Sequence, residues 1–334
     1  MSETDLAAVD AYGRRAVDLR VSLTDRCNLR CSYCMPAEGL AWMPSAEVLT
    51  ADELDRLLRV ATSRLGVTTI RLTGGEPLLR RDLEDIVARI AALPARPRIA
   101  LTTNGIGLAR RAQALRDAGL DRVNVSLDTL EPDRFATLTR RHRIDDVLAG
   151  ISAARDAGLR PTKVNSVLMR GINDDEAPQL VRWAGAEGVE LRFIEQMPLD
   201  AQHGWKRASM VTAADIHGWL AADGIELEAL PQRGSAPAER FRVVGSDQVV
   251  GIIAAVTQPF CGACDRVRLT ADGQLRSCLF SLGESDLRTP LRDGSGDDEL
   301  ERRWRACIAA KLPGHGINDP SFLQPPRPMS AIGG

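Results

Sequence analysis

The sequence predicts an α/β protein in which parallel strands alternate with crossover helices. From Val17 to about Glu195, a short β-rich run is followed by an amphipathic helical stretch, and this unit repeats along the chain. With 334 residues, the chain is long enough for one large domain and a smaller one. The repeat leaves two architectures open, an open doubly wound sheet and a full or partial barrel.

Short runs rich in β-branched and apolar residues predict the strands. Six runs are expected to form them: 19–23, 67–72, 99–103, 123–127, 162–168 and 189–194. Between the first two, Thr50 and Glu53 have the spacing of a capping box, which predicts the start of a helix. The predicted helix has one apolar face, formed by Leu54, Leu57, Leu58, Ala61 and Leu65.

After residue 200 the pattern changes, which predicts a second, smaller unit. A helix is expected near 212–222, then a connector containing Pro and Gly around 230–239. Shorter β runs follow at 241–244, 249–256 and 266–270. The last stretch, 312–334, is rich in Pro and Gly, a composition that ordinarily indicates a frayed tail.

Composition excludes several classes of protein. Hydrophobic residues make up 44% of the chain, charged residues make up 26%, and the net charge is -2, which is typical of a globular protein in water. We expect no membrane segment, and the charge balance gives no bulk attraction for nucleic acid. The first fifteen residues do not have the pattern of a signal peptide, so a cytoplasmic protein is expected.

Seven cysteines indicate metal chemistry. An odd number of cysteines without an export signal argues against a disulfide framework. Cys307 stands alone, and no role is predicted for it. The other six form two groups of three: Cys27, Cys31 and Cys34 near the start, and Cys261, Cys264 and Cys278 near the end.

The first cysteine group has the spacing Cys-x3-Cys-x2-Cys in a loop directly after the first predicted strand. A structural zinc site is one alternative, but zinc normally takes four protein ligands, often as two separated pairs. Three closely spaced thiolates can instead hold a four-iron cluster and leave one iron open for chemistry. The spacing therefore favours an iron-sulfur cluster over zinc.

This loop, after the first strand of a repeating βα domain, resembles that of the radical S-adenosylmethionine superfamily. Tyr33 supplies the aromatic residue usual before the third cysteine, and Gly74-Gly75-Glu76-Pro77 matches the family's glycine-rich turn. The resemblance implies that the open iron binds S-adenosylmethionine and that the reduced cluster cleaves it to a 5'-deoxyadenosyl radical. It also implies cofactor contacts from Tyr33, Gly75, Ser126 and Met197. Without it, Ser126 would be an ordinary strand-end hydroxyl and Met197 a core residue.

The second cysteine group has the spacing Cys-x2-Cys-x13-Cys. A zinc ribbon remains open here, with His315 or Cys307 as the fourth ligand. The pattern also resembles the auxiliary cluster of the GTP 3',8-cyclase family, in which a second four-iron cluster binds the purine. Segments 264–270 and 329–334 fit that family closely, and the resemblance extends over nearly the whole chain.

Two arginines beside the second cysteine group suggest a phosphate site. If 266–270 is a strand, Arg266 and Arg268 project from one face and Val267 and Leu269 from the other. Two neighbouring guanidinium groups suit a polyphosphate, which accepts charge-assisted hydrogen bonds. An exposed edge strand with solvated arginines is the alternative.

The same alternation groups other polar side chains near strand ends, which is where a barrel active site lies. No role is predicted for Asp128. Three pairs share a face in this way: Arg71 with Thr73, Lys163 with Asn165, and Ser126 with Asp128.

The resemblance to GTP 3',8-cyclases implies a partial (β/α)6 TIM-like barrel with a smaller C-terminal α+β region that carries the auxiliary cluster. The expected boundaries are 1–16 for an N-terminal extension, 17–200 for the barrel, 201–320 for the auxiliary-cluster region and 321–334 for the tail. Gly333 and Gly334 are implied to enter the active site and help set up hydrogen abstraction. The implied GTP contacts are Arg20, Arg71, Thr102, Lys163, Arg266, Val267 and Arg268.

The implied activity is conversion of GTP to 3',8-cyclo-7,8-dihydroguanosine 5'-triphosphate, the first step of molybdenum cofactor biosynthesis. Its implied cofactors are two 4Fe-4S clusters and S-adenosylmethionine. Implied partners are GTP, an electron donor of the flavodoxin or ferredoxin type, and a cyclic pyranopterin monophosphate synthase that uses the product. The sequence does not determine the oligomeric state and leaves a homodimer open. Two other functions stay open, a peptide-modifying radical enzyme with an auxiliary cluster and a non-catalytic protein with two zinc modules.

Overall fold

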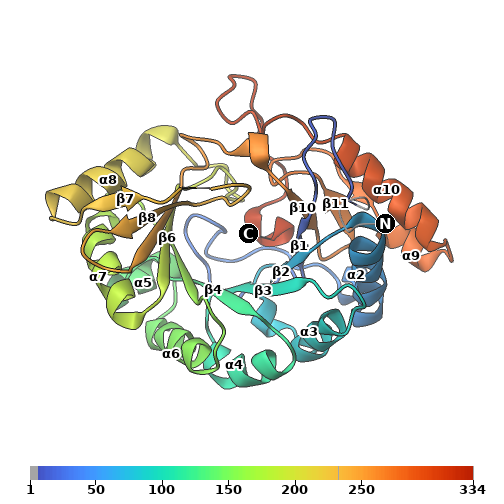
Figure 1. The fold of residues 1–334 in the computed structure, drawn as a ribbon, viewed down its shortest axis with the longest axis horizontal. Helices are drawn as coiled ribbons and strands as arrows, with labels where there is room; N and C mark the ends of the chain where they lie inside the picture. The colour runs from blue at the N-terminus through green and yellow to red at the C-terminus, as the bar shows by residue number, and fades with distance from the viewer. Residues whose placement is uncertain (1–6, 232, 334) are drawn as a thin grey trace.

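Twelve strands form one sheet in the order β12-β11-β10-β1-β2-β3-β4-β5-β6-β9-β8-β7. The computed structural model describes residues 7–231 and 233–333. The sheet curves around a central space and helices cover its outer face, which gives a partial TIM-like barrel (Figure 1). The predicted α/β class is therefore confirmed, and the curvature selects a partial barrel over an open doubly wound sheet.

Six parallel strands form the centre of this sheet, and each pairs with the next along the chain. Each lies within two residues of its predicted bounds. They are β1 Asp18–Ser22, β2 Thr69–Thr73, β3 Arg98–Thr103, β4 Arg122–Ser126, β5 Lys163–Val167 and β6 Glu190–Ile194.

Crossover helices connect these strands, and the first of them begins as the sequence predicts. The Thr50 hydroxyl accepts a hydrogen bond from the Glu53 amide, and the Glu53 carboxylate accepts one from the Thr50 amide. The predicted apolar face of this helix is buried. The helices are α2 Ala51–Leu65, α3 Leu83–Ala91, α4 Leu108–Asp117, α5 Pro132–Thr139, α6 Ile144–Asp156 and α7 Ala177–Glu187.

The region after residue 200 extends the same sheet at both edges instead of forming a sheet of its own. Strand β9 pairs in parallel with β6, and β10 pairs in parallel with β1. Strands β8 and β7 continue one edge in antiparallel order, and β11 and β12 continue the other. The bounds are α8 Ala213–Ala222, β7 Leu227–Ala229, β8 Glu239–Val243, β9 Val249–Ile253, β10 Arg266–Leu269, β11 Gln274–Arg276, β12 Ser285–Asp286, α9 Arg288–Arg292, α10 Asp297–Ala309 and α11 Met329–Ile332.

Alternating side chains divide each barrel strand into an apolar outer face and a polar inner face. Outward residues such as Leu19, Ile70 and Leu191 are fully buried in the core beneath the helices. Inward residues such as Arg71 and Lys163 are also buried, although they are charged. The barrel interior is therefore a polar space. In the described part of the chain, no helix is both long enough and apolar enough to cross a membrane.

Candidate functional site

The first cysteine loop follows β1 and packs against the glycine-rich turn that follows β2. The Gly75 amide donates to the Thr24 carbonyl at 2.7 Å, and the Glu76 amide donates to the Arg26 carbonyl at 2.7 Å. A Cβ atom at Gly74 would overlap the Thr24 carbonyl, and one at Gly75 would overlap the Arg26 carbonyl. The close approach of these two backbones requires glycine at both positions.

A buried carboxylate connects this turn to the first cysteine. Glu76 accepts hydrogen bonds from the Thr103 hydroxyl at 2.7 Å and the Asn104 amide at 2.7 Å. The Asn104 side chain in turn lies 3.9 Å from the Cys27 sulfur. Burial raises the pKa of Glu76 to about 7. Sequence reasoning missed Asn104, although it lies directly after β3, where polar strand-end residues gather.

A second buried carboxylate fixes the aromatic residue of the cysteine loop. The Tyr33 hydroxyl donates to Asp128 Oδ2 at 2.6 Å, and the Val167 amide donates to Oδ1 at 2.9 Å. Burial raises the pKa of Asp128 to about 6. Asp128, for which no role was predicted, thus joins the loop to the ends of β4 and β5.

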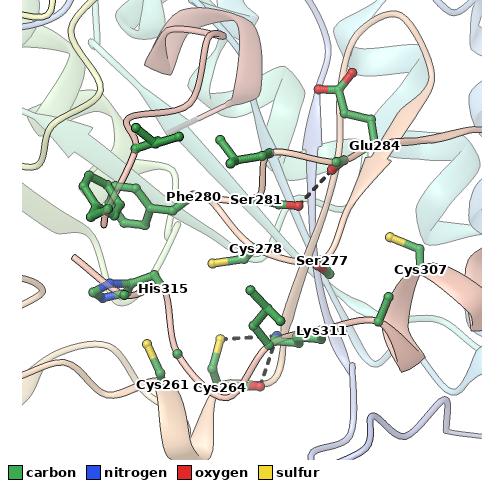
Figure 2. A pocket seen from close by; sticks show the side chains of 18 of the residues that line it. Cys261, Cys264, Ser277, Cys278, Phe280, Ser281, Glu284, Cys307, Lys311 and His315 are labelled. Carbon is green, nitrogen blue, oxygen red and sulfur yellow. Dashed lines mark hydrogen bonds between the residues drawn. The ribbon is translucent and has the colours of Figure 1, made fainter. Parts of the chain in front are cut away.

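The second cysteine group opens onto a cavity of about 550 Å³. The sulfur atoms of Cys261, Cys264 and Cys278 gather on one side of it (Figure 2). Cys307 lies apart from them and its thiol contacts the Leu275 carbonyl at 3.6 Å (Figure 2). The structure therefore groups the three predicted cysteines and leaves Cys307 outside the group.

Two cations from distant parts of the chain contact this group. The Lys311 ammonium donates to the Cys264 sulfur at 3.4 Å. The Arg14 guanidinium donates to the Cys261 carbonyl at 2.7 Å and is itself held by Asp10 at 2.6 Å. Although burial acts to raise it, the pKa of Cys264 is lowered by the charges of Arg266 and Lys311. Thiolate formation at Cys264 is therefore favoured, as metal binding requires.

The donor sets fit clusters better than single ions. Among the described residues, no three His, Cys, Asp or Glu side chains converge closely enough to hold one metal ion. Thiolates on one zinc ion lie about 3.8 Å apart, as bond lengths of 2.3 Å in a tetrahedron require. A four-iron cluster binds each thiolate through a different iron and so spaces them more widely. Two sets of three free cysteines, one beside a glycine-lined turn and one in a cavity, match that larger group.

Three arginines lie side by side on neighbouring strands, on the inner face of the barrel. Arg20 on β1 lies beside Arg268 on β10 and Arg71 on β2 in the strand register. Buried nitrogen atoms of Arg20 and Arg71 have no hydrogen-bond partner in the described chain. Burial and the charge of Arg20 lower the pKa of Arg71 to about 9 and hold that of Arg268 well below its usual range. Buried like charges without partners are costly, so this wall fits a polyanionic ligand.

The opposite wall carries a charged group that the sequence only partly identified. The Lys163 ammonium contacts both carboxylate oxygens of Glu190 at 2.8 and 2.9 Å, and Arg192 contacts the same carboxylate at 2.7 Å. Buried oxygens of Asp18 on β1, the strand of Arg20, and of Asn124 on β4 also lack partners in the described residues. Sequence reasoning missed Asp18, Asn124 and Arg192, although the same alternation places Asp18 two residues from Arg20 and Asn124 two residues from Ser126.

Two residues predicted to bind GTP, Thr102 and Val267, lie on opposite faces of the sheet. Thr102 lies next to Asn124 in register, on the inner face. Val267 is 1% exposed and belongs to the apolar core, so its side chain points away from the interior. The predicted GTP contact at Val267 stays a prediction, and the side chain faces the core because neighbouring residues of a strand face opposite sides. The predicted division of β10 into an arginine face and an apolar face is confirmed.

The C-terminal tail enters the barrel instead of fraying. The last described helix, α11, is drawn in red within the curve of the sheet in Figure 1, and its residue Ile332 is fully buried. The Arg268 guanidinium donates to the Gly333 carbonyl, and the Ser330 amide bonds to the Cys34 sulfur. Gly333 has φ 84, and a Cβ atom there would overlap the Thr73 hydroxyl. Gly334, the other predicted tail residue, lies outside the described residues.

Met197 packs against apolar residues on two sides. One set contains Ile332 of the tail, and the other contains Ile253 of β9. The tail thus links Met197, the first cysteine group and Arg268 around one interior space. That space is lined by arginines and lies near both cysteine groups. Buried polar atoms of Arg20, Arg71 and Arg266 have no hydrogen-bond partner in the described chain.

Comparisons with known proteins agree with this arrangement. Residues 21–184 match the family model described as "Radical SAM superfamily", and residues 189–317 match "Molybdenum Cofactor Synthesis C". The chain is 62% identical to a GTP 3',8-cyclase of Streptomyces coelicolor, over 98% of this chain and 96% of the relative. It is 53% identical to a GTP 3',8-cyclase of Paenarthrobacter nicotinovorans, over 98% of this chain and 96% of the relative.

Solved structures show the same fold at low sequence identity. Streptococcus suis SuiB bound to S-adenosylmethionine superposes with a TM-score of 0.60 at 14% identity, covering 87% of this chain and 69% of SuiB. Native anSMEcpe with bound AdoMet superposes with a TM-score of 0.55 at 13% identity, covering 87% of this chain and 88% of that one. At such identity, these likenesses bear on the fold alone.

Proposed function

This chain belongs to the GTP 3',8-cyclase family of radical S-adenosylmethionine enzymes, and we infer that it performs that family's reaction inside the barrel described above. The enzyme converts GTP to 3',8-cyclo-7,8-dihydroguanosine 5'-triphosphate, in molybdenum cofactor biosynthesis. Its cofactors are S-adenosylmethionine and two 4Fe-4S clusters. The observation that carries the substrate assignment is the row of buried arginines on β10, β1 and β2, in which nitrogen atoms of Arg266, Arg20 and Arg71 lack partners within the described chain.

The two cysteine groups have separate tasks. Cys27, Cys31 and Cys34 hold the cluster at which S-adenosylmethionine binds, with Tyr33, Gly75, Ser126 and Met197 as its other contacts. The chemistry that this cofactor pair supplies when bound is a 5'-deoxyadenosyl radical that removes the 3' hydrogen of GTP. Cys261, Cys264 and Cys278 hold the auxiliary cluster next to the purine.

The chain's own contribution is to bind, orient and enclose GTP. Arg266, Arg268, Arg20 and Arg71 bind the phosphates through charge-assisted hydrogen bonds. Lys163 adds a further cation from the opposite wall, and Thr102 adds a hydroxyl on the inner face. Correct placement of the ribose beside the guanine C8 turns cyclisation into a reaction between groups already in contact.

The tail closes this space. Gly333 keeps one of the phosphate-binding arginines in position through its carbonyl, and the buried Ile332 excludes water behind it. Gly333 and Gly334 are therefore proposed to set up productive hydrogen abstraction. An external flavodoxin or ferredoxin supplies electrons, and a cyclic pyranopterin monophosphate synthase uses the product. The proposed boundaries of the barrel and the auxiliary-cluster region are 17–200 and 201–320, and the proposed assembly is a homodimer.

Anaerobic reconstitution tests this function directly. The loaded protein should contain about eight iron atoms per chain and no stoichiometric zinc. With GTP, S-adenosylmethionine and a reductant, it should form 5'-deoxyadenosine and the cyclised nucleotide in equal amounts, measured by liquid chromatography and mass spectrometry. A colourless zinc protein, or adenosylmethionine cleavage that GTP never couples to product, would refute it.

A further inference from the structure

Lys311 is a buried cation at the second cysteine group that the reaction outlined above does not use. It follows α10 and is 6% exposed. Its ammonium group donates to the Cys264 carbonyl at 3.3 Å and the Cys264 sulfur at 3.4 Å (Figure 2). It also donates to the Arg266 carbonyl at 2.6 Å. All three ammonium protons therefore have acceptors.

Lysine suits this position for a physical reason. Three acceptors surround one point, and a compact ammonium group meets them with three rotatable donors, whereas a planar guanidinium group presents its donors as a fork. The chain otherwise relies on arginine, because only three of its 43 basic residues are lysines. The other two are Lys163 in the barrel and the exposed Lys206.

The position of this charge has an electrostatic consequence. A cluster that gains an electron becomes more negative, and a nearby positive charge stabilises that state. Burial limits the screening of this interaction by salt and water. The same ammonium group also bridges Cys264 and the first residue of β10, the strand that carries Arg266 and Arg268.

We propose that Lys311 is a positioning residue for the auxiliary cluster. Its ammonium group holds Cys264 against the start of β10 and raises the reduction potential of the cluster bound there. This inference rests on the proposed function, in which Cys261, Cys264 and Cys278 are the ligands of that cluster.

The test compares Lys311→Gln, which removes the charge but keeps a donor, with Lys311→Arg, which keeps the charge. Lys206→Gln is the control, since that lysine is exposed. Each change is made in the full chain with Cys27, Cys31 and Cys34 replaced by Ala, so that only the auxiliary cluster titrates. The readout is an anaerobic potentiometric titration followed by electron paramagnetic resonance.

We expect the ratio of reduced to oxidised cluster at a fixed potential to fall about tenfold in Lys311→Gln, which is about 59 mV for one electron. Lys206→Gln should match the parent chain, and Lys311→Arg should have a potential close to it because the charge remains, although the guanidinium fork meets the three acceptors less well. An unchanged potential in Lys311→Gln would overturn the proposal.

Cluster loading decides the remaining outcomes. Loss of the cluster in Lys311→Gln with retention in Lys311→Arg supports the proposal, because the charge is then what the site needs. Loss in both variants overturns the proposal, because a positive charge at this position then fails to preserve the cluster. A parent chain without any cluster would instead overturn the ligand assignment on which the inference rests.

Discussion

The two cysteine groups have the same number of thiols but opposite electrostatic surroundings. The first lies near the carboxylates of Glu76 and Asp128. Burial raises the pKa of Cys31 well above its usual range and that of Cys34 to about 12. The second lies beside Lys311, Arg266 and Arg14. There burial raises the pKa of Cys261, whereas the pKa of Cys264 is lowered by Arg266 and Lys311 although burial acts to raise it.

The different electrostatic surroundings suit the two cysteine groups to different tasks. Negative surroundings make a cluster harder to reduce and, once reduced, a stronger electron donor. Positive surroundings stabilise added negative charge and attract an anionic substrate. We therefore expect the first cluster to be reduced at a more negative potential than the second.

Replacing Cys27, Cys31 and Cys34 with Ala should have the largest effect. The chain should lose about half of its iron and all cleavage of S-adenosylmethionine, because the site of radical formation is removed. Iron analysis and quantification of 5'-deoxyadenosine measure both. Retained cleavage would show that the two groups do not divide the work as proposed.

Replacing Cys261, Cys264 and Cys278 with Ala should give the complementary result. Some uncoupled 5'-deoxyadenosine should still form, while the cyclised nucleotide disappears. Cys307→Ala serves as the matched control and should keep all iron and full turnover, since Cys307 lies apart from the other thiols (Figure 2). Loss of metal in Cys307→Ala would favour the zinc ribbon instead.

Changing Gly333 to Ala tests whether the tail unites the two groups. The new Cβ would overlap the Thr73 hydroxyl, and the residue would keep a positive φ that disfavours side chains. Cyclisation of GTP should nearly disappear while both clusters and the melting temperature stay unchanged. Gly296→Ala is the control, since that residue has open space around it and φ -77. Full turnover in Gly333→Ala would show that Gly333 is not needed for cyclisation of GTP.

Changing Arg266 or Arg268 to Ala tests the cationic side of the comparison. Each charge-assisted bond to phosphate contributes roughly 1.5 to 3 kcal/mol, so GTP affinity should weaken by about 10- to 150-fold. Equilibrium binding under anaerobic conditions measures it. Arg240→Ala, on the exposed face of β8, should bind GTP normally. Equal affinities in all three variants would show that neither Arg266 nor Arg268 binds the phosphates of GTP.

Raising the pH should have the smallest effect on GTP affinity, and it acts through Lys163 on the wall opposite the arginines. Burial and the charge of Arg192 lower the pKa of Lys163 to about 8. The lysine is protonated below that pH and neutral above it, so it attracts phosphate only on the acidic side. GTP affinity should fall by up to about tenfold from pH 7 to pH 9. Lys163→Arg should show a smaller fall over this range, and the part that remains is due to Arg71, whose pKa is lowered by burial to about 9. A fall of the same size in Lys163→Arg would assign the titration elsewhere.

Elements with several residues of clear periodicity could be predicted from the sequence. The six barrel strands and the capped helix α2 have such patterns, and the structure contains them all. Strands β11 and β12 were missed because they have three and two residues, too few to show alternation. Helix α10 was also missed, although Leu300, Trp304 and Ile308 repeat at helical spacing and are buried. A second, smaller unit was predicted after residue 200, and the pattern did not indicate that its strands join both edges of the barrel sheet.

The sequence by itself determined the local chemistry of this protein. Cysteine spacing, the glycine-rich turn and the alternation along β10 are encoded within a few neighbouring residues, where side-chain direction follows from backbone geometry. Only the tertiary structure decided that Arg268 lies beside Arg20, that Lys311 reaches Cys264, and that Gly333 reaches Arg268. The arginine and tail contacts depend on pairing between β1 and a strand about 250 residues later, which no local pattern specifies. Burial of the outer apolar face fixes the register of that pairing, and the register then brings the charges of the inner face together.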